Sequence, residues 1–410
     1  MATLYLHIGM PKTGTTYIQN FLRANNEVLK KEGYTYPDFG VSFGTIGLNR
    51  NAHFLVSVIR DEDRNRHIEE EQRIESECFD KLFSLFDEYP NVILSDESIW
   101  SSGERKRDKN FWPNFKNKLT EHGVELKAIV YLRRQDLFIQ SFWAQHVKEN
   151  SISDTLPEYI NTPRFKRIRL DYYARLNEIS EVIGKENMLV RVYEKDQYIG
   201  PKKTIISDFL TTIGLNYVPD NYTELDRLPN RTLSGIYLET KRELNKIEGF
   251  NKRKSYIQSL LRSVINTNDE VHSISSNEFM TSAQAASFLK RYEESNEKVA
   301  REYLGREDGK LFYDKQKLSD DNLPEYTVSD YVGVLAKMIE TQNNKVCELR
   351  GIVYQQKETI KELRRGNKEF EVQNRKLQST IDWMSASFPK KVARKLKRVF
   401  GIEKKSQAQR

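Results

Sequence analysis

Short apolar runs alternate with amphipathic stretches through the first three quarters of the chain. Four runs have the length and composition of buried strands, at residues 4–8, 92–95, 126–132 and 187–193. Helical spacing of apolar residues follows three of them, at residues 15–22, 136–147 and 202–213. Strands that alternate with helices predict βαβ units, so we expect an α/β fold with a mainly parallel sheet over residues 1–325.

The apolar pattern changes after Pro324. Between residues 335 and 384, seam positions recur in unbroken steps of four and three, and eleven of these fifteen positions are apolar. The polar seam positions are Gln342, Gln356, Asn367 and Asn374. Polar seam residues cost stability but can set register and strand number. The pattern predicts a coiled coil over residues 330–384, most simply in a homodimer, while a single long helix lying on the body is the alternative.

The positive charge of the chain is concentrated at its end. Residues 386–410 carry nine Lys/Arg and one Glu, a charge of +8 against +7 for the whole chain, which leaves −1 for residues 1–385. Val392, Leu396 and Val399 share one helical face among lysines and arginines. A basic amphipathic helix over residues 388–401 suits an anionic membrane surface. A solvated tail and nucleic-acid binding are the alternatives, and we expect no nucleic-acid partner.

Composition argues against a membrane-spanning protein, a disulfide scaffold and a histidine-based metal site. The chain has 410 residues, of which 38% are hydrophobic and 30% charged, and its mean hydropathy is −0.70. No apolar run has the length of a membrane-spanning helix, and no basic region precedes the first apolar run. Cys78 and Cys347 cannot form a disulfide framework, and the six histidines lack ligand-like spacing. We therefore expect no metal and a cytoplasmic protein, peripheral to the inner face of the membrane.

Residues 9–16, GMPKTGTT, are the most informative stretch. They lie between a predicted strand and a predicted helix, where backbone N–H groups and the positive helix end face an anion. Gly9 and Gly14 have the spacing of a Walker A loop, but Thr15 stands where that loop has lysine. The lysine of this loop is Lys12, which precedes Gly14. This position indicates an anion with fewer phosphates than a nucleoside triphosphate and no obligatory metal. A P-loop kinase or NTPase, with Asp96 as a magnesium ligand, and a non-enzymatic coiled-coil scaffold are the alternatives.

The run PKTGTT resembles the 5′-phosphosulfate loop of sulfotransferases that use 3′-phosphoadenosine 5′-phosphosulfate (PAPS). The resemblance implies a P-loop-like parallel sheet and PAPS as co-substrate. It also implies a catalytic Lys12 at the leaving group. The donor-binding residues that it implies in the loop are Pro11, Lys12, Thr13, Gly14, Thr15 and Thr16.

A second motif extends the resemblance. In this family an arginine at a strand end and a serine eight residues later contact the 3′-phosphate, and Arg133 and Ser141 have that spacing. A register slip would make Arg134 the contact instead. The segments VRVYEKDQ, DFLTTIGL and SNEKVAREYLGREDGKLF resemble a bacterial subgroup that acts on carbohydrates, over roughly residues 3–315. The acceptor implied is a hydroxyl of a surface polysaccharide or glycolipid, and the ending IDWMSASFPKKVARKLKR is similar to tails of bacterial surface-glycan transferases.

The family uses either histidine or glutamate to accept the proton of the acceptor hydroxyl. Two candidates stand at predicted cleft positions. His53 begins an apolar helical pattern after a polar loop, and Glu97 follows a strand whose carboxyl end should open onto the ligand crevice. Glu97 is equally suited to the first turn of a helix, where the helix dipole favours acids. His7 is a lesser candidate, for structural support or acceptor contact.

Overall fold

The computed structural model describes most of the chain. The described residues are 2–43, 46–47, 49–101, 110–149, 152–165, 168–225, 233, 235–251, 253–266, 279–314, 323–387 and 390–400.

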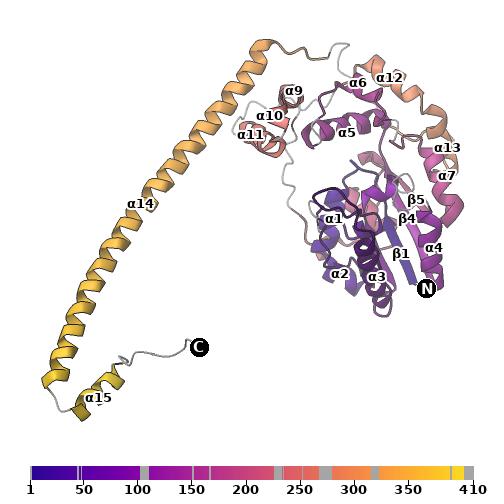
Figure 1. Ribbon diagram of the computed structural model, residues 1–410. Helices are drawn as coiled ribbons and strands as arrows, with labels where there is room; N and C mark the ends of the chain where they lie inside the picture. The colour runs from indigo at the N-terminus through magenta and orange to yellow at the C-terminus, as the bar shows by residue number, and fades with distance from the viewer. Residues whose placement is uncertain are drawn as a thin grey trace. The chain divides into compact units, whose positions relative to one another are not determined.

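Five parallel strands form the sheet at the centre of the body (Figure 1). Their spatial order is β2-β3-β1-β4-β5, so the direction of the winding reverses at β1. The strands are β1 Ala2–His7, β2 Tyr34–Thr35, β3 Asn91–Ser95, β4 Val124–Leu132 and β5 Met188–Val192. In open α/β sheets, ligands bind beyond the carboxyl ends of the strands at such a reversal. The sheet therefore directs attention to the loops that follow β1, β3 and β4.

Helices cover both faces of the sheet. Buried side chains of α1, α2 and α8 join one face of β1, β3 and β4 in a single apolar cluster, whereas α4 and α7 pack against β4 from the other side (Figure 1). The helices of the first half are α1 Thr15–Ala24, α2 Asn26–Lys31, α3 Ile68–Leu85, α4 Phe111–Glu121, α5 Gln135–Glu149, α6 Leu156–Ile160 and α7 Tyr172–Ile183. The later ones are α8 Ile205–Thr212, α9 Gly235–Leu244, α10 Glu248–Asn251, α11 Lys254–Asn266, α12 Ser282–Lys290 and α13 Glu293–Leu304. The predicted α/β class with a parallel sheet is confirmed.

The predicted strands correspond to β1, β3, β4 and β5, and the first three predicted helices correspond to α1, α5 and α8. The sequence pattern missed β2, because a two-residue strand cannot show any period. Within residues 230–305, residues 230–232, 234, 252 and 267–278 lie outside the described residues. The described remainder contains α9 to α13.

The chain divides into two units, residues 1–335 and residues 336–410. Val334, near the end of the first unit, is buried. One helix, α14 Val328–Ser387, runs through the predicted coiled-coil region, and α15 Lys390–Val399 follows it. Residues 388, 389 and 401–410 of the predicted tail lie outside the described residues. Within the described part of the chain, every helix is too short or too polar to cross a bilayer.

Candidate functional site

The turn between β1 and α1 leads into a helix whose first turn contains no acidic residue and whose N-cap has no side chain. Gly14 is the N-cap of α1 and adopts a left-handed conformation with φ of 76°. It provides no capping side chain, and the first turn of α1 contains no acidic residue. Thr13 donates a hydrogen bond from Oγ1 to the carbonyl of Met10 at 2.6 Å, which holds the turn. Backbone N–H groups at a helix start with no capping side chain and no acid in the first turn are suited to an external anion.

Gly14 is required by its surroundings as well as by its backbone. A Cβ atom at Gly14 would lie 3.1 Å from Cδ1 of Ile205 and 3.4 Å from Cε2 of Tyr193. The left-handed φ independently disfavours other residue types. The loop at residues 9–16 is thus packed closely against the segment that follows β5.

Arg133 reaches the same loop from the end of β4. Its Nη1 donates to the carbonyl of Lys12 at 2.8 Å, and its guanidinium lies 5.7 Å from the ring centre of Tyr193. The hydroxyl of Tyr172 donates to the backbone carbonyl of Arg133. Burial lowers the pKa of the Arg133 guanidinium, although nearby tyrosines oppose the shift. The sequence-predicted pair Lys12 and Arg133 is therefore brought together.

The positive charge of Arg133 disfavours the protonated form of the Lys12 amine. Burial lowers the pKa of Lys12, and Arg133 lowers it further, while the carboxylates of Glu149 and Glu97 act in the opposite direction. A bound anion would relieve this repulsion, because an opposite charge within a few ångströms favours the protonated form of an amine.

Arg134 has a different role from its neighbour. It is buried, and its Nε and Nη2 donate to the two carboxylate oxygens of Asp136 at 2.8 and 3.1 Å. Its Nη1 donates to the carbonyl of Asp314 at 2.7 Å. These bonds fix the start of α5 against the body. Of the two arginines, Arg133 is the one that contacts the loop at residues 9–16.

Ser141 lies two helical turns into α5 and is half-buried. Lys148 follows it by seven residues, a spacing that places both side chains on one face of the helix. Burial lowers the pKa of Lys148 to about 8, and repulsion from Lys12 adds to the effect. Sequence reasoning missed Lys148, although the spacing from Ser141 on a predicted helix was a usable signal.

A second network lies beyond β3 and is centred on Asp96. This carboxylate is fully buried and accepts from Nη2 of Arg50 at 2.5 Å, Nε of Arg50 at 3.1 Å and Nδ1 of His53 at 2.7 Å. It also caps the following turn by accepting from the backbone N–H of Ser98 at 2.7 Å. Burial raises the pKa of Asp96, but the bonds from His53 and Arg50 outweigh it and hold the pKa below its usual range.

Glu97 connects the second network to the loop. It accepts from Nε2 of Gln19 at 3.0 Å and pairs with Nη1 of Arg50 at 3.4 Å. A Cβ atom at Gly9 would lie 3.1 Å from Cβ of Glu97, so Glu97 packs directly on the start of the loop. Together with its effect on the pKa of Lys12, this places the Glu97 carboxylate on the loop side of the network.

His53 takes a more peripheral position. Its Nδ1 is bound to Asp96, and its ring meets that of Phe43 edge-on at 5.0 Å between centres. Arg50, which holds both Asp96 and Glu97, was missed by sequence reasoning. Its position three residues before His53 was the available signal. The structure therefore brings Lys12, Arg133 and Glu97 together, and holds His53 one contact further away.

His7 is structural. It is fully buried, and its Nδ1 lies 2.8 Å from Oγ of Ser95, which also accepts from Gln19 at 3.2 Å. Burial lowers the pKa of His7 to about 3, so its ring is neutral at ordinary pH. Its Nε2 is buried without a hydrogen-bond partner, and ring contacts with Tyr131 and Phe209 surround it.

The described residues contain no cluster of three or more His, Cys, Asp or Glu side chains placed to hold a metal ion. The groups available for a ligand are cations, backbone N–H groups and the carboxylate of Glu97. The arrangement can bind a phosphate-like anion at the start of α1 and can accept a proton beside it.

Comparison with known proteins shows a similarity to an archaeal protein. The chain is 27% identical over 224 residues to an uncharacterized protein of Archaeoglobus fulgidus, a match that covers 54% of this chain and 57% of that protein. The chain thus matches little more than half of its relative's length. No family model matches the sequence, and no solved structure matches it.

Proposed function

We propose that the protein transfers the sulfuryl group of PAPS to a hydroxyl of a carbohydrate, on a P-loop-like form of its parallel sheet. The observation that carries the proposal is the convergence of Arg133 and Lys12 at the start of α1. Two motifs more than a hundred residues apart in sequence, each resembling a part of a PAPS site, meet at the reversal point of the sheet. β1 and β4 are neighbouring parallel strands, so the segments after their carboxyl ends lie side by side, and both of these segments carry a motif that resembles a PAPS site.

The residues fit the two phosphate groups of such a donor. The start of α1 offers N–H groups and a positive helix end to the 5′-phosphosulfate, and Gly14 lets the backbone approach it closely. Arg133 offers a forked donor to the 3′-phosphate, and Ser141 lies two turns along the helix that follows. PAPS, when bound, supplies a sulfuryl group already joined to a good leaving phosphate.

The residues of the chain then have separable tasks in an in-line displacement. The acceptor oxygen forms its bond to sulfur as the sulfur–oxygen bond to the leaving phosphate breaks. Lys12 stabilises the charge that develops on that phosphate, and Glu97 takes the proton that the acceptor hydroxyl loses. The products are the sulfated sugar and 3′,5′-ADP. The reaction is balanced without a metal ion or a redox partner.

Glu97 is the better placed of the two candidate bases. Its carboxylate packs on the loop and acts on the pKa of Lys12, whereas His53 is bound through Nδ1 to Asp96. His53 and Arg50 in this proposal are positioning residues that fix Asp96 and, through Arg50, the Glu97 carboxylate.

A kinase or NTPase reading is less well supported. Both carboxylate oxygens of Asp96, the candidate magnesium ligand, are engaged by Arg50, His53 and the Ser98 backbone. A magnesium ligand would need at least one of these oxygens to be available to the ion.

The proposal extends to the rest of the chain. The coiled-coil pattern on α14 would form a homodimer, and the basic helix α15 would hold it at the anionic inner face of a membrane from the cytoplasmic side. Lipid-linked or nascent glycans would be within reach there.

The test is transfer of ³⁵S from PAPS to a panel of bacterial surface polysaccharides and glycolipids. We expect Glu97→Gln to lower turnover by about 10²–10⁴-fold, as loss of a general base does. His53→Gln should lower it less, because the loss is indirect. Glu88→Gln, which changes an exposed glutamate, is the matched control. Transfer of a phosphoryl group from ATP to the same acceptors would contradict the assignment. Full sulfuryl transfer by the Glu97→Gln variant would contradict it as well.

A further inference from the structure

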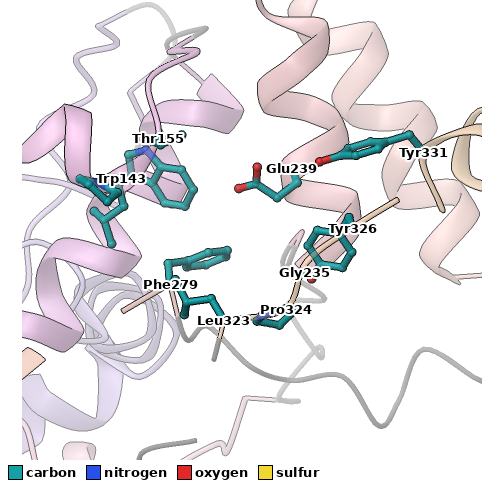
Figure 2. Close-up of a pocket in the computed structure, with 11 residues that line it drawn as sticks. Trp143, Thr155, Gly235, Glu239, Phe279, Leu323, Pro324, Tyr326 and Tyr331 are labelled. Atoms are coloured by element: carbon teal, nitrogen blue, oxygen red, sulfur yellow. The ribbon is translucent and has the colours of Figure 1, made fainter. Parts of the chain in front are cut away.

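A second concave site lies in the body, away from the loop at residues 9–16. It is a pocket of about 370 Å³, walled by four aromatic rings and one carboxylate (Figure 2). The rings are those of Trp143, Phe279, Tyr326 and Tyr331, and the carboxylate is that of Glu239. The lining comes from α5, the start of α6, α9, Phe279 and the segment that enters α14, which are distant from one another in sequence.

One wall is fixed to α5. The indole Nε1 of Trp143 donates to the carbonyl of Asp154 at 2.9 Å, and the ring of Phe279 lies 4.8 Å from that of Trp143 at 64°. The backbone N–H of Phe279 donates to Oε1 of Gln140 at 2.5 Å. The aromatic faces on this side are thus held in place before any ligand arrives, which reduces the entropy lost on binding.

The opposite wall contains the polar groups. In Figure 2 the Glu239 carboxylate points into the space between the walls, and the hydroxyl of Tyr331 is directed toward it. The rings of Tyr326 and Tyr331 lie 6.4 Å apart. Burial raises the pKa of both tyrosines and Glu239 adds to the effect, so their hydroxyls keep their protons and can donate.

The charge of Glu239 is already balanced. Its Oε2 accepts from Nε of Arg242 at 2.8 Å, and Arg242 also bonds to Glu243 and to the carbonyl of Ser153. Lys246 in turn pairs with Glu243. The four side chains sum to zero charge, so the pocket does not require a cationic ligand. Glu239 is left as a hydrogen-bond acceptor in an aromatic surrounding.

We infer that this pocket binds a neutral sugar ring. Sugar rings present apolar C–H faces that pack on aromatic side chains, and hydroxyl groups at their edges that donate to carboxylates. Phe279, Trp143 and Tyr326 would contact the faces, and Glu239 and Tyr331 the hydroxyls. That the sugar belongs to the acceptor glycan of the transferase rests on the proposed function, whereas sugar binding itself does not.

The pocket and the loop site share α5 but not the same side of it. Trp143 follows Ser141 by two residues, which places the two side chains on different faces of the helix. Binding in the pocket is therefore separable from donor binding at the loop.

The test uses the full chain and four neutral disaccharides, maltose, cellobiose, lactose and N,N′-diacetylchitobiose. Titration calorimetry and saturation-transfer NMR should show at least one binding with a Kd on the order of 1 mM. Tyr326→Ala should weaken that binding about tenfold or more, and Glu239→Gln and Tyr331→Phe by smaller factors. Tyr354→Ala, which removes an exposed tyrosine of α14, should change nothing.

Each other outcome overturns the inference. Tight binding of choline or glucosamine in place of the neutral sugars would identify a cation site. Equal sugar affinity in Tyr326→Ala, with folding checked by circular dichroism, would place the sugar elsewhere, and binding of none of the four would exclude this ligand class. Lys12→Ala, tested in parallel with 3′,5′-ADP, separates the two claims: it should lose nucleotide contacts while it keeps sugar affinity.

Discussion

Apolar side chains of the body are buried, whereas many apolar side chains of the long helix α14 are exposed. In the body, Leu4 and Leu6 of the central strand are fully buried, and the sheet is covered by helices on both faces. On α14, Leu363 and Phe370 each leave 68% of their surface exposed. The body therefore has its own core, whereas the apolar seam residues Leu363 and Phe370 of the second unit are exposed.

This difference suggests that catalysis belongs to the body and association to α14. Helices in proteins derive most of their stability from packing of an apolar face, so we propose a partner for α14, and its repeat of four and three fits a second copy of itself. All residues placed at the candidate catalytic site belong to the body. Chemistry and association should then respond to different substitutions.

The largest effect should come from the loop. Lys12→Ala should lower sulfuryl transfer by about 10²–10³-fold, because a preorganised positive charge at the leaving phosphate is lost. Dimerisation and vesicle binding should be unchanged. The measurement is ³⁵S transfer alongside light scattering, with the exposed Lys31→Ala as the control. Near-normal turnover in the folded Lys12→Ala protein would show that the loop is not catalytic.

Deletion of the tail should act on the other region. A chain ending at Ser387 should lose binding to anionic vesicles by about a hundredfold or more, because each of the basic residues removed contributes roughly 1 kcal/mol near such a surface. Transfer to a soluble acceptor should be retained. Co-sedimentation with vesicles at low and high salt measures the effect, since surface charges are screened at high ionic strength.

A seam variant separates the tail from the coiled coil. The double substitution Leu363→Lys and Phe370→Lys should yield a monomer that still has one tail and binds vesicles more weakly than the dimer, through lost avidity. Unchanged vesicle binding after tail deletion, or a monomeric wild-type chain at micromolar concentration, would refute this division of tasks.

The smallest effect concerns the stability of the body. The folded state holds His7 neutral, with its pKa near 3, while the unfolded state binds a proton below its usual pKa of 6.5. Stability should therefore fall as pH drops from 6.5 toward 3, by up to about 1.4 kcal/mol per pH unit. His7→Gln should flatten this slope, and the exposed His122→Gln should not. Denaturant unfolding at several pH values provides the measurement.

Much of the fold could be predicted because its strands are buried on both faces and stand out as continuous apolar runs. The loop at residues 9–16 was visible because glycine and lysine spacing is local in sequence. Gln19 was not, because its role arises from a contact with Glu97 that sequence spacing does not encode. The pocket around Trp143 and Tyr326 was missed for the same reason, since its walls meet only in the folded chain.

The central claim is that Arg133 and the loop at residues 9–16 bind a nucleotide that has a 3′-phosphate. Calorimetric titration of the full chain with 3′,5′-ADP, 5′-AMP and ATP should show 3′,5′-ADP binding about tenfold or more tightly than 5′-AMP, because a charge-assisted contact to the 3′-phosphate contributes roughly 1.5–3 kcal/mol. Arg133→Ala should remove most of that difference. Equal affinity of the wild-type chain for 3′,5′-ADP and 5′-AMP, or a clear preference for ATP with magnesium, would contradict the assignment.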